Sequence, residues 1–432
     1  MILNISIKNF RSFKDEVIFS MVAESSKSKE HNIFIQPISK GTDEIRILNS
    51  ALIYGANASG KSNVLRGLFD IIKLITKNQQ TGGEKIIEYD PFQFDQLNIN
   101  APVEFYIEFV GKDEIKYKYE LHFVYNEVVK EELIYWPNSK PEQLFTRFKS
   151  NDINSLIHWG QLGPSLENTK FEIFKNQTFL SKFGKDLPND IISKVYIYLD
   201  KIVIINACSF AMMEKAKAEV SNKMTNDMEF EKKINELLKF ADTGLEGVSV
   251  RKIEKDKFKF PETFPLEERN KIINRNLFSM SGIHALYYKS QFVDNVYLPF
   301  NQESNGTRAL YTLGGKMLDV LAYGGILLVD ELETSFHSYL AKILIRLFQN
   351  KRINSKNAQL IFTTHDTNLL DRTLFRKDQV WFTEKNNFGV TELYSLQDFS
   401  EVKEDTPFDK WYLAGKFGGL PNLKSIESLF IS

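Results

Sequence analysis

The chain has 432 residues, of which 43% are hydrophobic and 26% are charged, and its formal net charge is −1. This composition is typical of a globular protein with about two or three domains or one elaborated domain, and it excludes a strongly basic chain that would bind nucleic acid through its overall field. The single cysteine excludes an internal disulfide and a cysteine-based zinc site.

The N-terminal segment alternates apolar and polar residues, with Ile5 and Ile7 among the apolar ones. A period of two predicts a strand and not a cleavable leader. No apolar run approaches the length of about 18 residues that a membrane span needs, so a cytoplasmic protein without membrane contact is expected. Residues 24–45 are polar and rich in Ser and Lys, and they are expected to form a loop.

A phosphate-binding pattern follows the next predicted strand, Ser50–Tyr54. Residues 55–62 read GANASGKS and match GxxxxGK[ST], and apolar residues from Val64 to Ile75 then recur on one helical face. Glycines in such a loop let backbone N–H groups point at phosphate oxygens, and the helix adds the positive end of its dipole. The alternative is a plain glycine turn between a strand and a helix. The full pattern in this context favours nucleotide binding.

Two side chains of this loop have predicted roles in binding ATP and its metal ion. Lys61 is expected to reach the β- and γ-phosphates, and Ser62 is expected to ligate Mg²⁺. The predicted nucleotide-binding residues of this segment are Gly55, Asn57, Gly60, Lys61, Ser62 and Asn63.

The middle of the chain changes character twice. Residues 101–136 hold aromatic and β-branched runs with turn residues between them, which predicts an antiparallel meander. Residues 165–245 carry longer helical patterns, and residues 246–300 return to short strands. The predicted division is an N-terminal lobe with the phosphate loop over 1–160, a helical insertion over 161–245 and a C-terminal lobe over 246–432.

Helices and buried strands alternate in the C-terminal part, which predicts a parallel sheet. The apolar run Ile326–Val329 delivers Asp330 and Glu331 at its carboxyl end, where ligands of open α/β sheets bind. Asp330 is expected to hold Mg²⁺ through water, and Glu331 is expected to act as the general base. The alternative for Glu331 is to cap the next helix. Glu333 is expected to be a solvated acid at a helix start, with a role at an interface as the alternative.

A histidine ends the next predicted strand, at residues 358–366, which read AQLIFTTHD. At that edge His365 can hydrogen-bond the γ-phosphate and the attacking water. A lone histidine is more often structural, but its place one strand beyond Asp330 and Glu331 favours a catalytic role. Residues 379–384 predict a third buried strand.

Residues 303–307 read ESNGT, at the start of a helical face, and they resemble the signature motif of ABC-type ATPases. Together with both phosphate motifs and His365 they form a set of four in the order of that family. The long gap before the signature resembles the SMC and RecF branch, as does IKNFRSF at residues 7–13. The resemblance implies an α/β, ABC-type P-loop ATPase head with an antiparallel β lobe and a helical insertion.

The resemblance also implies a head-to-tail dimer, or a higher oligomer of dimers, with composite ATP sites. Each ATP would lie between the phosphate loop of one copy and Ser304 and Gly306 of the other, so only ATP would bridge both faces. Arg11 resembles a family position near the nucleotide, with an exposed strand-end charge as the alternative. Gln93 is the candidate for the family glutamine that senses Mg²⁺. The signature departs from the transporter form LSGGQ, which puts transport coupling in doubt.

Longer stretches narrow the likeness to one group of ABC-type ATPases. The chain is similar to the ATPase subunits of bacterial anti-phage and abortive-infection systems of the RloA or AbiL type, and to the related PARIS ATPase AriA. Such ATPases are typically encoded beside an effector nuclease, often of the TOPRIM type. The resemblance implies an ATP-hydrolysing switch that controls a partner effector, with ATP and Mg²⁺ as cofactors and DNA or a phage component as the trigger. The stretches that carry the likeness are NFRSFKDEVIFSM, ALIYGANASGKSN, ESNGTR, DELETSFH and WYLAGKFGGLPNL.

Three other functions are weighed against this one. A RecF- or SMC-like ATPase of DNA repair or recombination would use the same site residues. A self-contained nuclease would need a TOPRIM glutamate and a DxD motif, and no DxD follows His365. A GTPase would need an [NT]KxD motif, which the chain lacks. The basic stretches at 251–259 and 268–275 contain interspersed acids, which favours a solvated face over a DNA contact.

Overall fold

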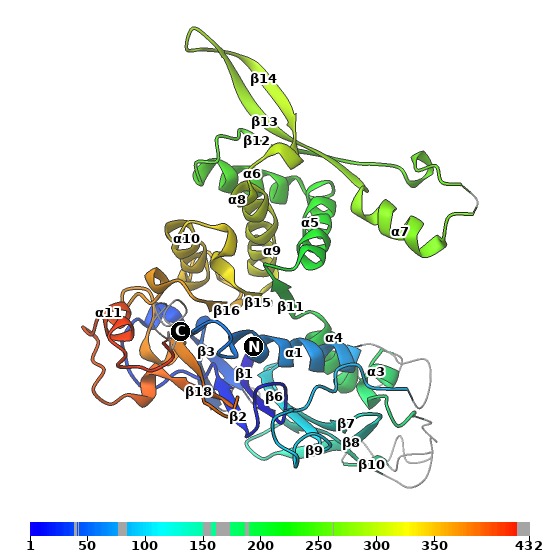
Figure 1. Ribbon diagram of the computed structural model, residues 1–432, viewed down its shortest axis with the longest axis vertical. Helices are drawn as coiled ribbons and strands as arrows, with labels where there is room; N and C mark the ends of the chain where they lie inside the picture. The colour runs from blue at the N-terminus through cyan, green and yellow to red at the C-terminus, as the bar shows by residue number, and fades with distance from the viewer. Residues whose placement is uncertain are drawn as a thin grey trace, which may run out of the picture.

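Two large sheets form the base of the molecule, and a helical region with a protruding hairpin rises from them (Figure 1). The computed structural model describes residues 1–38, 41, 43–76, 84–149, 157–160, 173–185, 190–261 and 263–420. The two sheets share a hydrophobic core, because buried residues of both belong to one continuous cluster.

The central sheet has six strands in the order β11-β15-β16-β5-β17-β18. The first five strands run parallel, and β18 pairs antiparallel with β17 at one edge. The bounds are Ser50–Gly55 for β5, Val203–Asn206 for β11, Ile326–Asp330 for β15, Gln359–Thr364 for β16, Val380–Lys385 for β17 and Thr391–Ser395 for β18. The parallel sheet and its strands β5, β15, β16 and β17 confirm the prediction.

Alternate residues of β15 pack into two different cores, which explains why the strand reads as one continuous apolar run. Leu328 belongs to the same core as α1 (Lys61–Thr76), whereas Leu327 and Val329 belong to the core of α9 (Gly315–Tyr323). Figure 1 shows α1 on one side of β15 and β16 and α9 on the other. Helices therefore cover both faces of the sheet, as the α/β prediction requires.

The second sheet is antiparallel throughout, with the order β10-β9-β8-β7-β6-β1-β2. It confirms the predicted N-terminal strand and the predicted meander, and it continues beyond residue 136 through β9 and β10. The bounds are Ile2–Lys8 for β1, Val17–Ser20 for β2, Val103–Val110 for β6, Lys116–Val124 for β7, Glu127–Trp136 for β8, Glu142–Phe148 for β9 and Ile157–Trp159 for β10.

The predicted loop at 24–45 contains structure, so this prediction was wrong. A 3₁₀ turn, η1 (Glu30–Asn32), leads into β3 (Ile33–Ile38), which pairs antiparallel with β4 (Asp43–Leu48) as a separate two-stranded sheet. Ser and Lys residues before the turn dominated the composition of the window. Ile33, which follows these residues in the sequence, is buried. Averaging the composition over the whole segment therefore concealed a short apolar run.

The predicted insertion at 161–245 is mainly helical in its described residues. It forms α3 (Phe179–Phe183), α4 (Asp190–Asp200), α5 (Phe210–Met224) and α6 (Met228–Phe240). It also contributes β11, which pairs with β15 in the central sheet. The β-branched run at 203–205 was the only signal for this strand, and it is too short to separate a strand from a helical segment by periodicity.

A three-stranded antiparallel sheet carries the protruding hairpin. It consists of β12 (Gly247–Lys252), β13 (Phe278–Tyr288) and β14 (Gln291–Pro299). The strands predicted between 246 and 300 are confirmed, and β13 and β14 extend well away from the helical region (Figure 1). The connection between β12 and β13 also holds a 3₁₀ turn and a helix, which the prediction of short strands did not include. Their bounds are Lys255–Lys257 for η3 and Leu266–Arg275 for α7.

The helix predicted from Gly306 starts as α8 (Asn305–Ala309) and passes through a π-helical turn, η5 (Leu310–Gly314), into α9. None of the helices in the described part of the chain has the length and apolar character that a membrane crossing needs. The remaining elements are η4 (Phe300–Gln302), η6 (Leu332–Ser335), α10 (Ser338–Gln349), η7 (Thr367–Leu369), η8 (Lys377–Gln379), η9 (Leu396–Asp398) and α11 (Phe408–Leu413).

Candidate nucleotide-binding site

The phosphate loop and the acidic strand end meet in the folded chain. Ser62 donates a hydrogen bond from Oγ to Asp330 Oδ1 at 2.9 Å, across 268 residues of sequence. The contact follows from topology, because β5 and β15 are parallel strands of one sheet and both end at the same edge. The structure thus brings together the two motifs that the sequence predicts to share a magnesium ion.

Both carboxylate oxygens of Asp330 are held by neighbouring strands. Thr363 of β16 donates from Oγ1 to Oδ1 at 2.6 Å, and Asn206 of β11 donates from Nδ2 to Oδ2 at 2.7 Å. Asp330 is buried, and these donors hold its carboxyl group in one orientation. The Thr363 hydroxyl also accepts from the Glu331 backbone N–H at 2.8 Å, which fixes both acids relative to β16. Sequence reasoning missed Asn206, because it did not indicate β11.

Lys61 is folded back into the phosphate loop. Its side chain is buried, and Nζ donates to the carbonyls of Gly55 at 2.8 Å and Ala56 at 3.0 Å. Burial lowers the pKa of Lys61, and the Glu331 carboxylate partly offsets this. In this structure the ammonium group is therefore bonded to two carbonyls of the loop. Phosphate oxygens are expected to replace these carbonyls when a nucleotide binds.

The loop is supported by β18 and by the C-terminal tail. Gly60 has φ of +111°, and a Cβ atom there would lie 2.5 Å from Thr391 Oγ1, so this position requires glycine. Thr391 also donates to the Ser59 carbonyl at 2.8 Å. The Ala56 N–H donates to the Gly419 carbonyl at 3.0 Å, which ties residues near the end of the chain to the phosphate loop.

Arg11 lies beside the first turn of α1. Its Nη1 donates to Asn63 Oδ1 at 3.1 Å, and its Nε donates to Asp90 Oδ2 at 2.8 Å. Asn63 in turn donates from Nδ2 to Ser12 Oγ at 2.7 Å. The predicted positions Arg11 and Asn63 are therefore joined next to the phosphate loop. The nucleotide role of Arg11 stays a prediction.

Two other predicted residues are exposed. Asn57 lies at the exposed tip of the phosphate loop. Gln93 follows Asp90 in the same segment, and its amide donates to the Pro91 carbonyl at 2.9 Å. The segment lies near Arg11, because the Arg11 N–H donates to the Asp90 carbonyl at 2.8 Å. The magnesium-sensing role of Gln93 stays a prediction.

Glu331 has an unusual backbone conformation for its residue type, with φ of +58°. Non-glycine residues in this region cost about 1–3 kcal/mol and concentrate at functional sites. Its Oε2 accepts a hydrogen bond from Cys208 Sγ at 2.8 Å, and Thr334 Oγ1 lies 3.4 Å away. Its side chain accepts no capping hydrogen bond from a backbone N–H of the following turn, which argues against the capping alternative.

Glu333 holds His365, and the expectation that it is a solvated acid was wrong. Its side chain is 7% exposed, and Oε1 accepts from the His365 backbone N–H at 2.7 Å and lies 2.9 Å from Nδ1. The turn η6 places the Glu333 side chain beside His365, directly after β16. The position of Glu333 at a predicted helix start does not reveal this contact. The contact orients the His365 ring by Nδ1 and leaves Nε2 as the ring nitrogen for a ligand.

The signature segment is an exposed helix start on the other side of the sheet from α1 (Figure 1). Ser304 is the N-cap of α8, and its Oγ accepts from the Thr307 N–H at 3.1 Å. Gly306 lies in the first turn. Within the described residues, no hydrogen bond joins Ser304 or Gly306 to the phosphate loop of the same chain. The predicted composite site would therefore need a second copy.

The oxygen ligands at the phosphate loop fit a magnesium ion. Mg²⁺ in nucleotide sites usually takes one or two protein ligands, with waters and phosphate oxygens completing an octahedron. Ser62 Oγ and Asp330 Oδ1 are hard oxygen ligands in contact with each other. Across the described part of the chain no cluster of three His, Cys, Asp or Glu side chains could hold a metal ion by itself.

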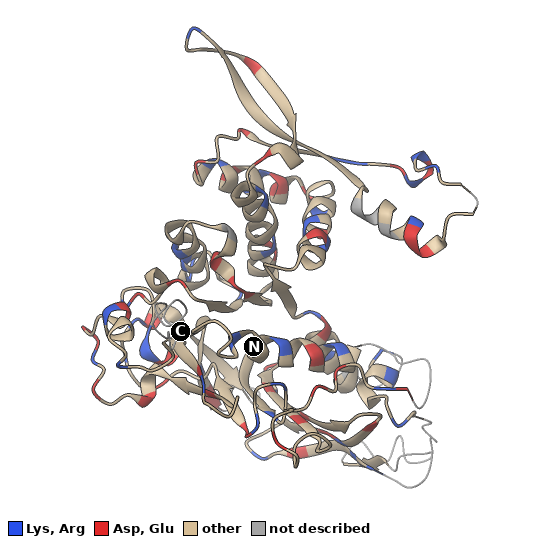
Figure 2. Cartoon of the chain, in the orientation of Figure 1, with Lys and Arg blue, Asp and Glu red and all other residues tan. Residues whose placement is uncertain are grey.

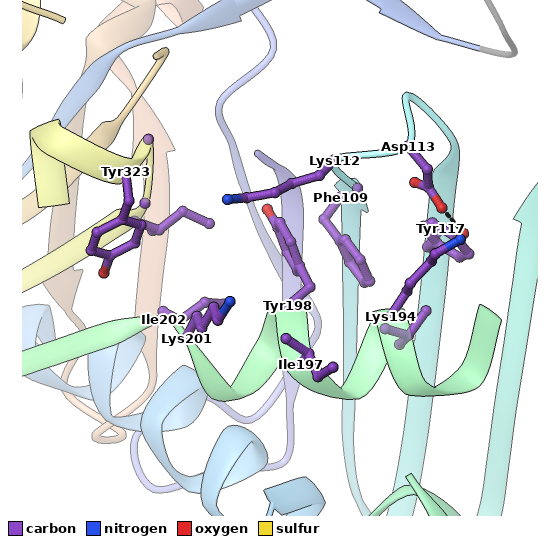
Figure 3. A pocket seen from close by; sticks show the side chains of 15 residues that line it. Phe109, Lys112, Asp113, Tyr117, Lys194, Ile197, Tyr198, Lys201, Ile202 and Tyr323 are labelled. Carbon is purple, nitrogen blue, oxygen red and sulfur yellow. Dashed lines mark hydrogen bonds between the residues drawn. The ribbon is translucent and has the colours of Figure 1, made fainter. Parts of the chain in front are cut away.

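A partly open apolar cavity of about 310 Å³ lies elsewhere, between α4, the β6–β7 turn and the start of β15 (Figure 3). Phe109, Tyr198 and Tyr323 are among its lining residues, and Ile326 marks the end of β15 opposite to Asp330. This cavity is not part of the nucleotide site.

The two basic stretches retain their mixed character in the fold. Figure 2 shows acidic residues among the basic ones around η3 and on α7. Lys257 lies 3.5 Å from Glu254, and both side chains are exposed. This arrangement agrees with the solvated face that the sequence favours.

Comparisons with known proteins identify a family that covers most of the chain. The family model described as "AAA domain, putative AbiEii toxin, Type IV TA system" matches residues 50–371, which is more than half of the chain and includes both phosphate motifs, the signature segment and His365. A comparison with curated proteins finds no match.

Several solved structures are similar to the chain at low identity. The SMC head domain from Thermotoga maritima is 14% identical, with a TM-score of 0.36 over 91% of this chain and 98% of that one. An SmcHead bound to the C-winged helix domain of ScpA is 11% identical, with a TM-score of 0.44 over 91% and 97%. The recombination mediator protein RecF, as RecF-ATPrS, is 13% identical, with a TM-score of 0.37 over 91% and 98%.

Proposed function

This chain belongs to the family of AAA domains described with the AbiEii toxin of type IV toxin–antitoxin systems, and from that premise we propose that it binds ATP and hydrolyses it to ADP and phosphate. The observation that carries the proposal is the 2.9 Å hydrogen bond from Ser62 to Asp330. It joins the phosphate loop to the acidic strand end, as a site for ATP with magnesium requires.

Nucleotide binding exchanges one set of partners of Lys61 for another. The ammonium group leaves the carbonyls of Gly55 and Ala56 and bonds to the β- and γ-phosphate oxygens. Backbone N–H groups of residues 55–62 and the start of α1 stabilise the phosphate charge. Ser62 and Asp330 would hold Mg²⁺, which neutralises charge on the β- and γ-phosphates when bound.

Hydrolysis uses the acid that follows Asp330. Glu331 accepts a proton from the attacking water, whose oxygen forms a bond to the γ-phosphorus as the bond from that phosphorus to the β–γ bridging oxygen breaks. The products are ADP and inorganic phosphate. His365, held at Nδ1 by Glu333, donates or accepts at Nε2 near the γ-phosphate.

The Glu331→Gln variant tests this role, because glutamine keeps the shape of the side chain and loses its basicity. We expect kcat to fall on the order of 10²–10⁴-fold, while the Kd for a fluorescent ATP analogue stays near the wild-type value. Glu392→Gln, an exposed acid on β18, is the control and should hydrolyse normally. Wild-type turnover in Glu331→Gln would remove the residue from the base role.

We further propose that two copies close head to tail around ATP. Ser304 and the Gly306 N–H of one copy then bind the γ-phosphate held by the phosphate loop of the other copy. The exposed N-cap geometry of Ser304 supports this arrangement, as does the lack of a hydrogen bond to the phosphate loop of the same chain among the described residues. Mass measurement of Glu331→Gln should give a dimer with ATP and a smaller species with ADP. A Ser304→Arg exchange in the same background should keep ATP binding and abolish the dimer.

The proposed biological role is a switch that controls a partner effector, most simply a nuclease, in anti-phage defence. The family description, which names a toxin, and the RloA- or AbiL-like stretches support it. Expression of the chain together with its neighbouring gene should protect cells from phage, and Lys61→Ala should abolish protection. Protection that persists in the Lys61→Ala variant would contradict an ATP-driven switch.

The alternative is an ATPase of DNA repair or recombination. It shares every site residue with the defence proposal, so the two differ only in what stimulates turnover. Double-stranded DNA added to the purified chain should raise kcat several-fold for a repair ATPase, with a steep salt dependence. A DNA-independent rate that changes only with the partner effector would favour the defence role.

A further inference from the structure

The β13–β14 hairpin runs directly into the signature segment. β14 ends at Pro299, the turn η4 follows, and Glu303 is the next residue. The hairpin protrudes from the helical region (Figure 1), and its outer part exposes large side chains that include Tyr287 and Phe292, with about 60% of each accessible. A displacement of the hairpin therefore reaches the signature through only a few residues of chain.

A side-chain contact joins the hairpin to the first signature residue. His284 of β13 lies with Nε2 at 2.9 Å from Glu303 Oε1, and the Glu303 side chain is only 10% exposed. The neighbouring Gly282 makes room for this carboxylate, because a Cβ atom there would overlap Glu303 Oε1. Glu303 stands where the transporter signature has leucine. Its carboxylate contacts the hairpin.

A second set of contacts joins the base of the hairpin to the signature helix. Tyr311 is fully buried in the π-helical turn between α8 and α9, and its hydroxyl lies 2.9 Å from Ser221 Oγ of α5. Ser221 Oγ also lies 3.5 Å from Met280 Sδ of β13. The ring of Phe300, just after β14, contacts the Tyr311 ring edge-on, with centroids 5.1 Å apart. Single π-helical turns inside α-helices are frequent at functional sites.

We propose that His284 and Glu303 are a positioning pair that fixes the position of Ser304. Through this pair, a displacement of the β13–β14 hairpin moves the signature segment. This inference rests on the proposed function, in which Ser304 binds the γ-phosphate held by a second copy. Ser304 follows Glu303 directly, so the anchored carboxylate fixes the start of α8. A misplacement of about 1 Å in a binding group can cost on the order of 100-fold in rate, so a small shift of the hairpin is sufficient to change turnover.

The first test is His284→Ala in the full chain. We expect kcat to fall roughly tenfold, because the signature is displaced, while the Kd for a fluorescent ATP analogue is unchanged, because the phosphate loop of the same chain is intact. His284→Gln keeps an N–H donor in a similar place and should restore most of the rate. A double-mutant cycle with Glu303→Ala should show no additional loss in the double variant.

The matched control is His122→Ala. His122 Nε2 lies 2.9 Å from Glu120 Oε1 in the antiparallel sheet, with similar exposure, and has no contact with the signature segment among the described residues. It should leave kcat unchanged. Wild-type turnover in His284→Ala would overturn the proposal, as would a parallel loss of nucleotide affinity and melting temperature, which indicates a folding role. Absence of hydrolysis in the wild-type chain would instead contradict the proposed function.

Discussion

Asn206 holds Asp330, the proposed magnesium ligand, from a strand outside every sequence motif. Its Nδ2 donates to Asp330 Oδ2, while its own Oδ1 accepts from the Cys208 N–H at 2.9 Å. Cys208 then reaches Glu331, so a segment of three residues contacts both acids. The orientation of the acidic pair thus depends on β11 as well as on β15.

The Asn206→Ala variant should bind Mg²⁺ less well. Residues that orient a metal ligand typically contribute 10–100-fold to affinity, so we expect the Mg²⁺ concentration for half-maximal turnover to rise on the order of tenfold. The measurement is ATP turnover against Mg²⁺ at saturating ATP. Asn222→Ala, an exposed residue on α5, is the control. An unchanged Mg²⁺ dependence in Asn206→Ala would show that Thr363 and Ser62 suffice to orient Asp330.

Alkylation of Cys208 should stop hydrolysis without stopping nucleotide binding. Cys208 is the one cysteine of the chain, so N-ethylmaleimide modifies a single position. The adduct removes the hydrogen bond to Glu331 and places a bulky group beside the carboxylate. Turnover measured against the labelled fraction by mass should fall in proportion, and Cys208→Ser should be resistant. Fully labelled protein with wild-type turnover would contradict this.

The labelling rate has a defined pH dependence. Burial raises the pKa of the Cys208 thiol, and the hydrogen bond to Glu331 raises it further. The thiolate is the reactive form, so labelling should be slow at neutral pH and should accelerate as the pH approaches this raised value. The Cys208 rate should therefore stay below that of a free thiol throughout the neutral range.

At the scale of elements, the sequence predicts those helices, strands and loops that show a hydrophobic period or a complete motif. The strands β5, β15 and β16 read as apolar runs because both faces are buried, and the phosphate loop carries all its required residues. The strand β11 is too short to show a hydrophobic period. The strands β3 and β4 follow, in the sequence, a polar segment that dominates the local composition. Glu333 shows the limit of prediction from the sequence at the candidate site, because only the fold brings its carboxylate to His365.

The antiparallel sheet holds α3 through a buried ion pair. Glu131 of β8 and Arg147 of β9 are each at most 1% exposed, with Nη1 at 3.5 Å from Oε2. Glu131 also accepts from the N–H groups of Phe179 at 2.7 Å and Leu180 at 3.3 Å, at the start of α3. The pair therefore fixes the position of the first described helix of the insertion on the sheet.

Removing one partner of this pair should destabilise the sheet strongly. Arg147→Met leaves a buried unpaired carboxylate, and such changes cost about 3–5 kcal/mol. The matched control is Lys149→Met, since Lys149 pairs with Glu127 at 2.7 Å but is more than half exposed, and such pairs contribute less than about 1 kcal/mol. Melting temperatures compare the two. A similar shift in both variants would contradict the buried role.

The loss in Arg147→Met should depend on pH. Burial raises the pKa of Glu131 and the Arg147 charge lowers it, so the variant should have a still higher value. A carboxyl whose folded pKa exceeds its unfolded pKa binds more protons when folded, so its contribution to stability falls as pH rises. The melting temperature of Arg147→Met should therefore lie closer to wild type at pH 5 than at pH 8.

At the scale of the whole molecule, the two halves of the proposed ATP site lie on different elements with different neighbours. The phosphate loop is enclosed by β18 and the C-terminal tail, whereas the signature segment is anchored to the hairpin. Each half is thus supported by its own part of the chain. A dimer would join these two surfaces, and we expect one substitution in each to disable that surface alone.

That independence permits a complementation test of the head-to-tail dimer. Lys61→Ala disables the phosphate loop and Ser304→Arg disables the signature, so each variant alone should be inactive. A mixed dimer has one site with both defects and one intact site, formed by the Ser304→Arg phosphate loop and the Lys61→Ala signature. Equal mixing should therefore restore turnover to at most about half of the wild-type value, since neither variant dimerises with itself and each mixed dimer has one intact site out of two. The Lys61→Ala protein alone, at the same total concentration, is the control. If the mixture stays inactive although mixed dimers are seen by mass, or if Ser304→Arg alone hydrolyses normally, the site is complete within one copy.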